Sequence, residues 1–125
     1  MAVRLDKKKI FLLYQYYLLG EINPQGIKEE VVNWFNNQFL AKEDFLRQKV
    51  ARQLKSTWDF SRLPPLEKAI LIYGAYELLL EQKASHSNLV INNLINFSKA
   101  YLGKEKIGYV NKVLDLLIQE KKSER

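Results

Sequence analysis

Residues 62–82 read RLPPLEKAILIYGAYELLLEQ, and this stretch decides the fold. Pro64-Pro65 forces an extended approach and then permits a helix start, because a proline in the first turn loses no intrahelical hydrogen bond. The apolar run that follows predicts a helix from Leu66 to about Gln82, with the small polar surface of a helix surrounded by others. Gly74 costs about 1 kcal/mol of helix propensity relative to alanine, so we expect a neighbouring helix to approach the backbone closely there.

Two more helices are predicted on the C-terminal side of this stretch. Ser87 or Asn88 can cap a helix that ends at Gly103, a residue suited to a left-handed helix end. A last helix is expected from about Lys106 to Glu120, and the tail formed by residues 121–125 is expected to fray.

Three helices are predicted on the N-terminal side. The first runs from about Leu5 to Leu19 and stops at Gly20. It is apolar almost all round from Ile10 onward, which predicts that other helices enclose it. The next two are expected from about Ile27 to Leu40 and from about Glu43 to Thr57. The whole chain, residues 1–125, is therefore predicted to form a single all-α domain, a compact helical bundle.

The composition narrows the classes of function. A chain of 125 residues with a formal charge of +6 and a pI near 9.5 fits one domain with an acidic partner such as nucleic acid. One histidine, no cysteine and no phosphate-binding glycine motif argue against an enzyme, a metal site and a cofactor. Residues 10–19 follow three lysines as in a signal peptide, but they are too short for the ~20 residues that span a bilayer. We therefore expect a cytoplasmic protein without a membrane segment.

Two groups of basic residues, each with a tyrosine nearby, are candidates for nucleic-acid binding. Arg4, Lys7 and Lys8 have the spacing of one helical face, and Tyr14 lies seven residues beyond Lys7. The second group has a spacing of three residues, which indicates an outward face for its tyrosine: Lys106, Tyr109 and Lys112. Single-stranded RNA suits both groups, because cations meet phosphates while a ring stacks on a base. A solvated charged face explains the same spacings, and both interpretations stay open.

Three motifs, one in the first helix and two in the last two, point to one family. They are Leu12-Leu13-Tyr14-Gln15, Val90-Ile91-Asn92-Asn93 and Tyr109-Val110-Asn111-Lys112-Val113-Leu114-Asp115. The order and the residues of these motifs resemble those of the NusB family of bacterial transcription antitermination factors. The resemblance implies an all-α fold of two packed helical subdomains. It also implies binding to the boxA element of nascent ribosomal RNA together with the ribosomal protein NusE, in an antitermination complex on RNA polymerase.

The resemblance also implies roles for individual residues. The RNA-contacting residues of the family correspond here to a basic N-terminal segment and to two residues of the last motif: Arg4, Lys7, Lys8, Lys9, Tyr109 and Asn111. Lys106 joins this RNA-binding group because of its spacing from Tyr109. Tyr14 and Glu67 correspond to the surface that meets the ribosomal protein. Glu67 is expected to stay exposed because it lies beside the helix start.

The chain departs from the family pattern at three places. Asn93 replaces the Glu of Ile-Asn-Glu, Lys112 replaces the Gly of Val-Asn-Gly, and Arg4 with lysines replaces an arginine cluster. Lysine keeps the charge but lacks the planar fork that grips a phosphate with two hydrogen bonds. Two functions therefore stay open. One is an RNA-binding antitermination factor, and the other is an adaptor that keeps the NusE contact but lacks specific RNA binding. The free protein is expected to be a monomer or a homodimer.

Overall fold

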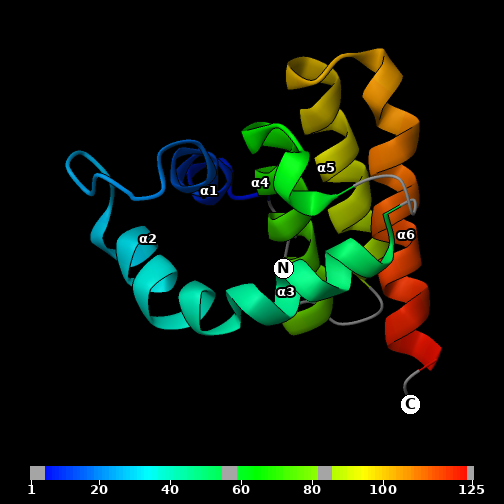
Figure 1. Cartoon of the computed structure of the whole chain (residues 1–125), viewed down its shortest axis with the longest axis horizontal. Helices are drawn as coiled ribbons and strands as arrows, with labels where there is room; N and C mark the ends of the chain where they lie inside the picture. The colour runs from blue at the N-terminus through cyan, green and yellow to red at the C-terminus, as the bar shows by residue number, and fades with distance from the viewer. Residues whose placement is uncertain (1–4, 55–58, 82–85, 124–125) are drawn as a thin grey trace.

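Helix α4 (Pro65–Tyr76) is the element around which the other helices pack. The computed structural model describes residues 5–54, 59–81 and 86–123. Helices α1 (Lys7–Leu19) and α3 (Leu40–Arg52) contact α4 on the N-terminal side of the chain, and α5 (Ser87–Tyr101) and α6 (Ile107–Ser123) contact it from the C-terminal side. Figure 1 shows α5 and α6 side by side, with α1 on the other side of α4. Every regular element of the described residues is helical, which confirms the predicted all-α class.

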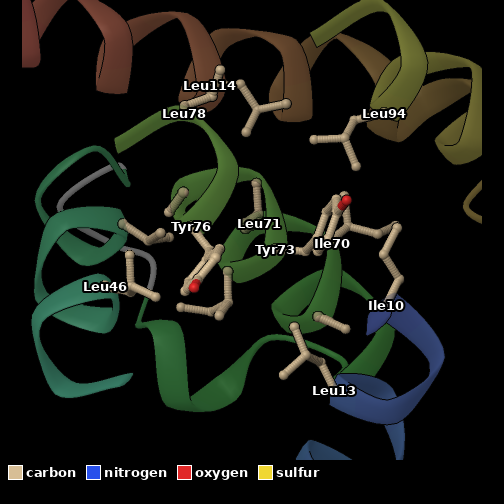
Figure 2. Packing of buried hydrophobic residues seen from close by; sticks show 14 of the residues in the cluster. Ile10, Leu13, Leu46, Ile70, Leu71, Tyr73, Tyr76, Leu78, Leu94 and Leu114 are labelled. Carbon is tan, nitrogen blue, oxygen red and sulfur yellow. The ribbon is translucent and has the colours of Figure 1, made fainter. Parts of the chain in front are cut away.

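The core lies along α4, as its apolar sequence predicts. All residues from Ala69 to Tyr76 are buried. Figure 2 shows side chains from α1, α3, α5 and α6 converging on this helix, among them Ile10, Leu13, Leu46, Leu94 and Leu114. Pro65 occupies the first turn, where the missing N–H has no intrahelical partner to lose. The other helices are therefore positioned by their packing against α4.

At Gly74, side chains from the C-terminal pair of helices lie close to the backbone of α4. A Cβ atom placed there would lie 2.5 Å from Cδ2 of Leu114 and 3.0 Å from Cδ1 of Leu94. Both distances are below ordinary van der Waals contact, so a larger residue would force the side chains of Leu114 and Leu94 to shift. The close helix approach predicted for Gly74 is confirmed.

Residues 29–52 form one continuous helical run, so the predicted break between Leu40 and Glu43 is wrong. Helix α2 (Glu29–Trp34) passes through a π-helical turn, η1 (Phe35–Phe39), directly into α3. No glycine or proline interrupts residues 27–57. The extra residue of a π turn shifts the helical register. The rings of Phe35 and Phe39 are stacked with their centroids 5.4 Å apart, and both are buried.

Helix α1 is open to solvent on one face, contrary to the enclosure that its composition predicts. It ends as expected at Gly20, which has a φ of +82° and donates its N–H to the carbonyl of Tyr16. Ile10, Leu12 and Leu13 are buried against the core. Large side chains on the remaining surface are exposed: Phe11, Leu18 and Leu19. One apolar face of α1 is therefore covered by the fold and another is not.

The end of α6 is tied to the rest of the molecule and does not fray where expected. The helix continues through Ser123, and Lys121 Nζ donates to the carbonyl of Leu78 at 2.8 Å. Leu78 belongs to a second π-helical turn, η3 (Glu77–Glu81), which continues α4. Glu120 accepts hydrogen bonds from Lys49 at 2.9 Å and Arg52 at 2.8 Å, and these bonds lower the pKa of its carboxyl. Ion pairs between helices thus extend α6 beyond its predicted end.

None of the helices in the described part of the chain is both long enough and apolar enough to cross a membrane.

Candidate functional site

The start of α1 is held in place from two directions. The Asp6 carboxylate caps the helix by accepting from the backbone N–H groups of Lys8 at 3.1 Å and Lys9 at 3.3 Å. The backbone N–H of Asp6 donates to the hydroxyl of Tyr73 at 3.0 Å. Tyr73 lies in the core on α4, and burial raises the pKa of its hydroxyl. The lysines of the first turn are therefore carried by a helix start fixed to the centre of the fold.

The three lysines of this turn point in different directions. Lys7 and Lys8 are exposed, whereas Lys9 is half-buried. The Nζ atom of Lys9 lies 4.7 Å from the ring centroid of Trp34, within the range of a cation–π interaction. Lys9 is thus directed toward α2, apart from the other two. Arg4, the remaining cation predicted in this group, lies outside the described residues.

Two exposed aromatic rings lie beside these lysines, and neither was among the predicted site residues. Phe11, one turn after Lys7, is 41% exposed, and Tyr101 at the end of α5 is 50% exposed. Their ring centroids are 5.7 Å apart. The spacing of Phe11 from Lys7 was available in the sequence. The exposure of both rings was not, because it depends on how α1 packs against α5.

Two grooves flank Phe11. A groove of about 450 Å³ lies between α1 and α5 and is lined in part by Lys7, Asn96 and Tyr101. The other, of about 310 Å³, is lined by Phe11 itself and in part by Lys8 and Lys28. Each groove thus combines at least one lysine with an aromatic ring. Cations beside exposed rings are the side chains that hold single-stranded nucleic acid.

Three of the other predicted residues form a separate and partly buried cluster: Glu67, Lys106 and Tyr109. Glu67 is only 3% exposed, so the expectation that it stays at the surface is wrong. Lys106 Nζ lies 3.6 Å from Oε1 of Glu67, and the Lys106 side chain is 42% exposed. The carboxylate sits at the head of an apolar helix, and α6 with its preceding turn covers it. Lys106 therefore balances a charge inside the protein.

Tyr109 does not face outward as the spacing of its neighbouring lysines predicts. Its side chain packs against the core and its hydroxyl oxygen is buried. Burial raises the pKa of the Tyr109 hydroxyl, and the negative charge of Glu67 raises it further. Asn111 and Lys112, next along α6, are exposed. The C-terminal motif thus contributes a partly buried tyrosine with a buried hydroxyl and an exposed amide, where a ring for stacking was expected.

Tyr14, the second predicted partner residue, lies on the half-buried side of α1. Its ring packs against the core while part of the side chain remains accessible. The adjacent Gln15 accepts a hydrogen bond from the backbone N–H of Asn23 at 2.7 Å, which holds the loop after α1. The accessible part of Tyr14 is therefore presented by an anchored segment.

Comparison with known proteins places the chain in a family. The NusB family matches residues 5–119. The transcription antitermination protein NusB of Methylacidiphilum infernorum is 29% identical over 96 residues, covering 77% of this chain and 65% of that protein. Its counterpart from Thiobacillus denitrificans is 35% identical over 81 residues, covering 65% of this chain and 54% of that protein. The chain thus spans about half to two-thirds of the length of these relatives. No solved structure matches the chain. With nearly its whole length matched, this chain belongs to the NusB family.

Proposed function

We propose that the chain acts as a transcription antitermination factor that binds single-stranded boxA-type RNA at the surface formed by α1 and α5. The observation that carries this proposal is the exposed position of Lys7 and Lys8 on either side of Phe11, whose ring contacts Tyr101. Lysines neutralise phosphates, and exposed rings stack on unpaired bases. We call this surface, made of Lys7, Lys8, Phe11 and Tyr101, the α1 surface.

The remaining residues predicted to contact RNA differ in how accessible they are. Asn111 is exposed and can add a hydrogen bond to RNA. The Lys106 side chain is 42% exposed, but its Nζ atom is paired with Glu67. Tyr109 packs against the core, and Lys9 is engaged with Trp34. The main RNA contacts are therefore assigned to the α1 surface.

The proposed protein partner is a NusE-type ribosomal protein, bound as part of an RNA polymerase antitermination complex. The family membership of the chain and the partly accessible ring of Tyr14 support this assignment. Glu67 contributes indirectly, because it holds Lys106 and thereby the turn before α6. We expect Tyr14→Ala to weaken the complex in calorimetry. Unchanged affinity with a folded variant would remove Tyr14 from the partner surface.

The RNA assignment is tested with the double variant Lys7→Glu/Lys8→Glu. Filter binding to a boxA-type RNA at several salt concentrations should show weaker binding and a flatter plot of log K against log salt. If each lysine neutralises one phosphate of a single strand, the slope should fall by about 1.4. The matched control is Lys42→Glu/Lys122→Glu, which changes the total charge equally at exposed positions on α3 and α6.

Two outcomes would contradict the proposal in different ways. An unchanged slope in the Lys7→Glu/Lys8→Glu variant, or an equal loss in the control, would remove the α1 surface from RNA binding. Wild-type binding that is equally tight for boxA and for scrambled RNA would favour the adaptor function, because phosphate contacts alone discriminate poorly among sequences.

A further inference from the structure

We propose that the groove between α1 and α5 is a subsite for one unpaired RNA base, with Tyr101 stacked on the face of the base and the amide of Asn96 bonded to its edge. The inference rests on the proposed function, because it assumes that RNA reaches the α1 surface. It assigns to this groove the task of distinguishing one base from another.

The size and lining of the groove suit a single nucleotide. Its volume of about 450 Å³ falls within the range of about 300 to 1,000 Å³ that is usual for small-molecule sites. Of the described residues that line it, Lys7 is the only charged one, and none is acidic. One cation matches one phosphate, whereas a site for a longer polyanion would need several. The groove therefore fits a base together with its own phosphate.

Tyr101 provides a fixed face on which a base can stack. Its ring lies 4.5 Å from the ring of Phe97, with an angle of 27° between the two planes, and Phe97 is buried. The inner side of Tyr101 is thus supported by the core, while half of the residue remains exposed. An unpaired base can extend this pair of stacked rings outward, and such stacking tolerates any base because each has a π face.

Asn96 provides the edge contact. It is exposed on α5 and lines the groove. Its amide presents a donor and an acceptor next to each other, and this pairing allows two hydrogen bonds to one base edge. The amide carries no charge that would repel the phosphate. Stacking thus supplies affinity at this site, and the Asn96 amide supplies discrimination.

The test measures the affinity of wild type and variants for four short RNA homopolymers of A, C, G and U. Wild type should bind one homopolymer better than the others. Asn96→Ala should reduce the ratio between the best-bound and the worst-bound RNA about fivefold or more, because a bidentate contact is lost. Tyr101→Leu should weaken binding of all four by about fivefold or more and leave the ratio nearly unchanged.

The matched control is Asn92→Ala. Asn92 is exposed on the same helix but does not line the groove, so its loss should leave both affinity and ratio unchanged. Asn96 is also exposed, so its truncation should not unfold the domain, and circular dichroism checks this. As a second measurement, the side-chain NH₂ signals of Asn96 in nuclear magnetic resonance should shift when the best-bound homopolymer is added.

The outcomes separate this inference from the proposed function. Equal affinity of wild type for the four RNAs, or an unchanged ratio in Asn96→Ala, would overturn the base subsite. If Lys7→Glu/Lys8→Glu still weakened binding in that case, RNA binding at the α1 surface would stand. If wild type bound none of the RNAs, including boxA, both the inference and the proposed function would fail.

Discussion

The α1 surface and the cluster at the head of α4 contain the same kinds of residue, but the fold uses them in opposite ways. At the α1 surface, Lys7 and Lys8 are exposed beside accessible rings. In the cluster, Lys106 pairs with Glu67, and Tyr109 is packed behind them. A lysine and an aromatic at helical spacing are therefore exposed together at the start of α1, whereas at the head of α4 a carboxylate from another helix meets the lysine.

The largest expected effect comes from Glu67→Lys. This change places a second positive charge beside Lys106 in a buried position, so the free energy of unfolding should fall by about 3 kcal/mol or more. Glu67→Gln keeps the shape and should cost about 1 to 3 kcal/mol. Urea denaturation measures both. If Glu67→Lys were as stable as wild type, the cluster would be as open as the α1 surface and the comparison would fail.

Truncation of the two tyrosines should also separate the regions. Tyr109→Ala empties a site in contact with the core and should lower the free energy of unfolding by about 2 to 4 kcal/mol. Tyr101→Ala removes a half-exposed ring and should cost about 1 kcal/mol or less. Thermal melting of the two variants gives the order directly. A larger loss for Tyr101 would reverse the assignment of buried and exposed roles.

The buried hydroxyl of Tyr109 should make the free energy of unfolding depend on pH in alkaline solution. The pKa of its hydroxyl is raised in the folded state, so the unfolded chain loses this proton first, above about pH 10. Stability contributed by the protonated hydroxyl is therefore complete below pH 10 and falls as the pH rises further. Tyr109→Phe should make the decline of unfolding free energy less steep, by up to about 1.4 kcal/mol per pH unit. Parallel curves for wild type and Tyr109→Phe above pH 10 would show that the hydroxyl is not buried.

The smallest expected effect on stability is that of Lys7→Glu/Lys8→Glu. Both side chains are exposed, so the free energy of unfolding should change by only about 0.5 kcal/mol. The same variant is expected to lose RNA affinity while keeping its stability, whereas Glu67→Lys is expected to lose stability. A stability loss of several kcal/mol would mean that these lysines hold the fold together and are not available to a ligand.

Much of the fold follows from local signals in the sequence. Pro64-Pro65, Gly20 and Gly103 mark helix boundaries because each restricts or frees the backbone where it stands, and Gly103 indeed has a φ of +88°. No glycine or proline lies near the break that was expected after Leu40, and the helix continues there through a π turn. Boundaries without glycine or proline depend on tertiary packing, which the sequence pattern does not display.

The candidate site was less predictable because exposure is a property of helix pairs. The spacing of Lys7 and Lys8 identified two exposed cations correctly. Phe11 looked like a core residue in an apolar helix, and only the position of α5 shows that its ring reaches the surface. Lys106 and Glu67 are 39 positions apart in the sequence, so no local pattern reveals that they pair. The sequence therefore shows where charged residues stand in the chain, but which residues they pair with depends on the fold.

The hydrogen bond from Asp6 to Tyr73 has a consequence for the motions of α1. The first N–H groups of a helix normally exchange with solvent early, because they lack intrahelical acceptors. The Asp6 amide is instead bonded to a core side chain, and the Lys8 and Lys9 amides are bonded to the Asp6 carboxylate. Deuterium should therefore enter the Asp6 amide only when the start of α1 separates from α4. A helix end that would ordinarily fray is thus fixed to the core, and the backbone that carries Lys7 and Lys8 is already ordered before any ligand is bound.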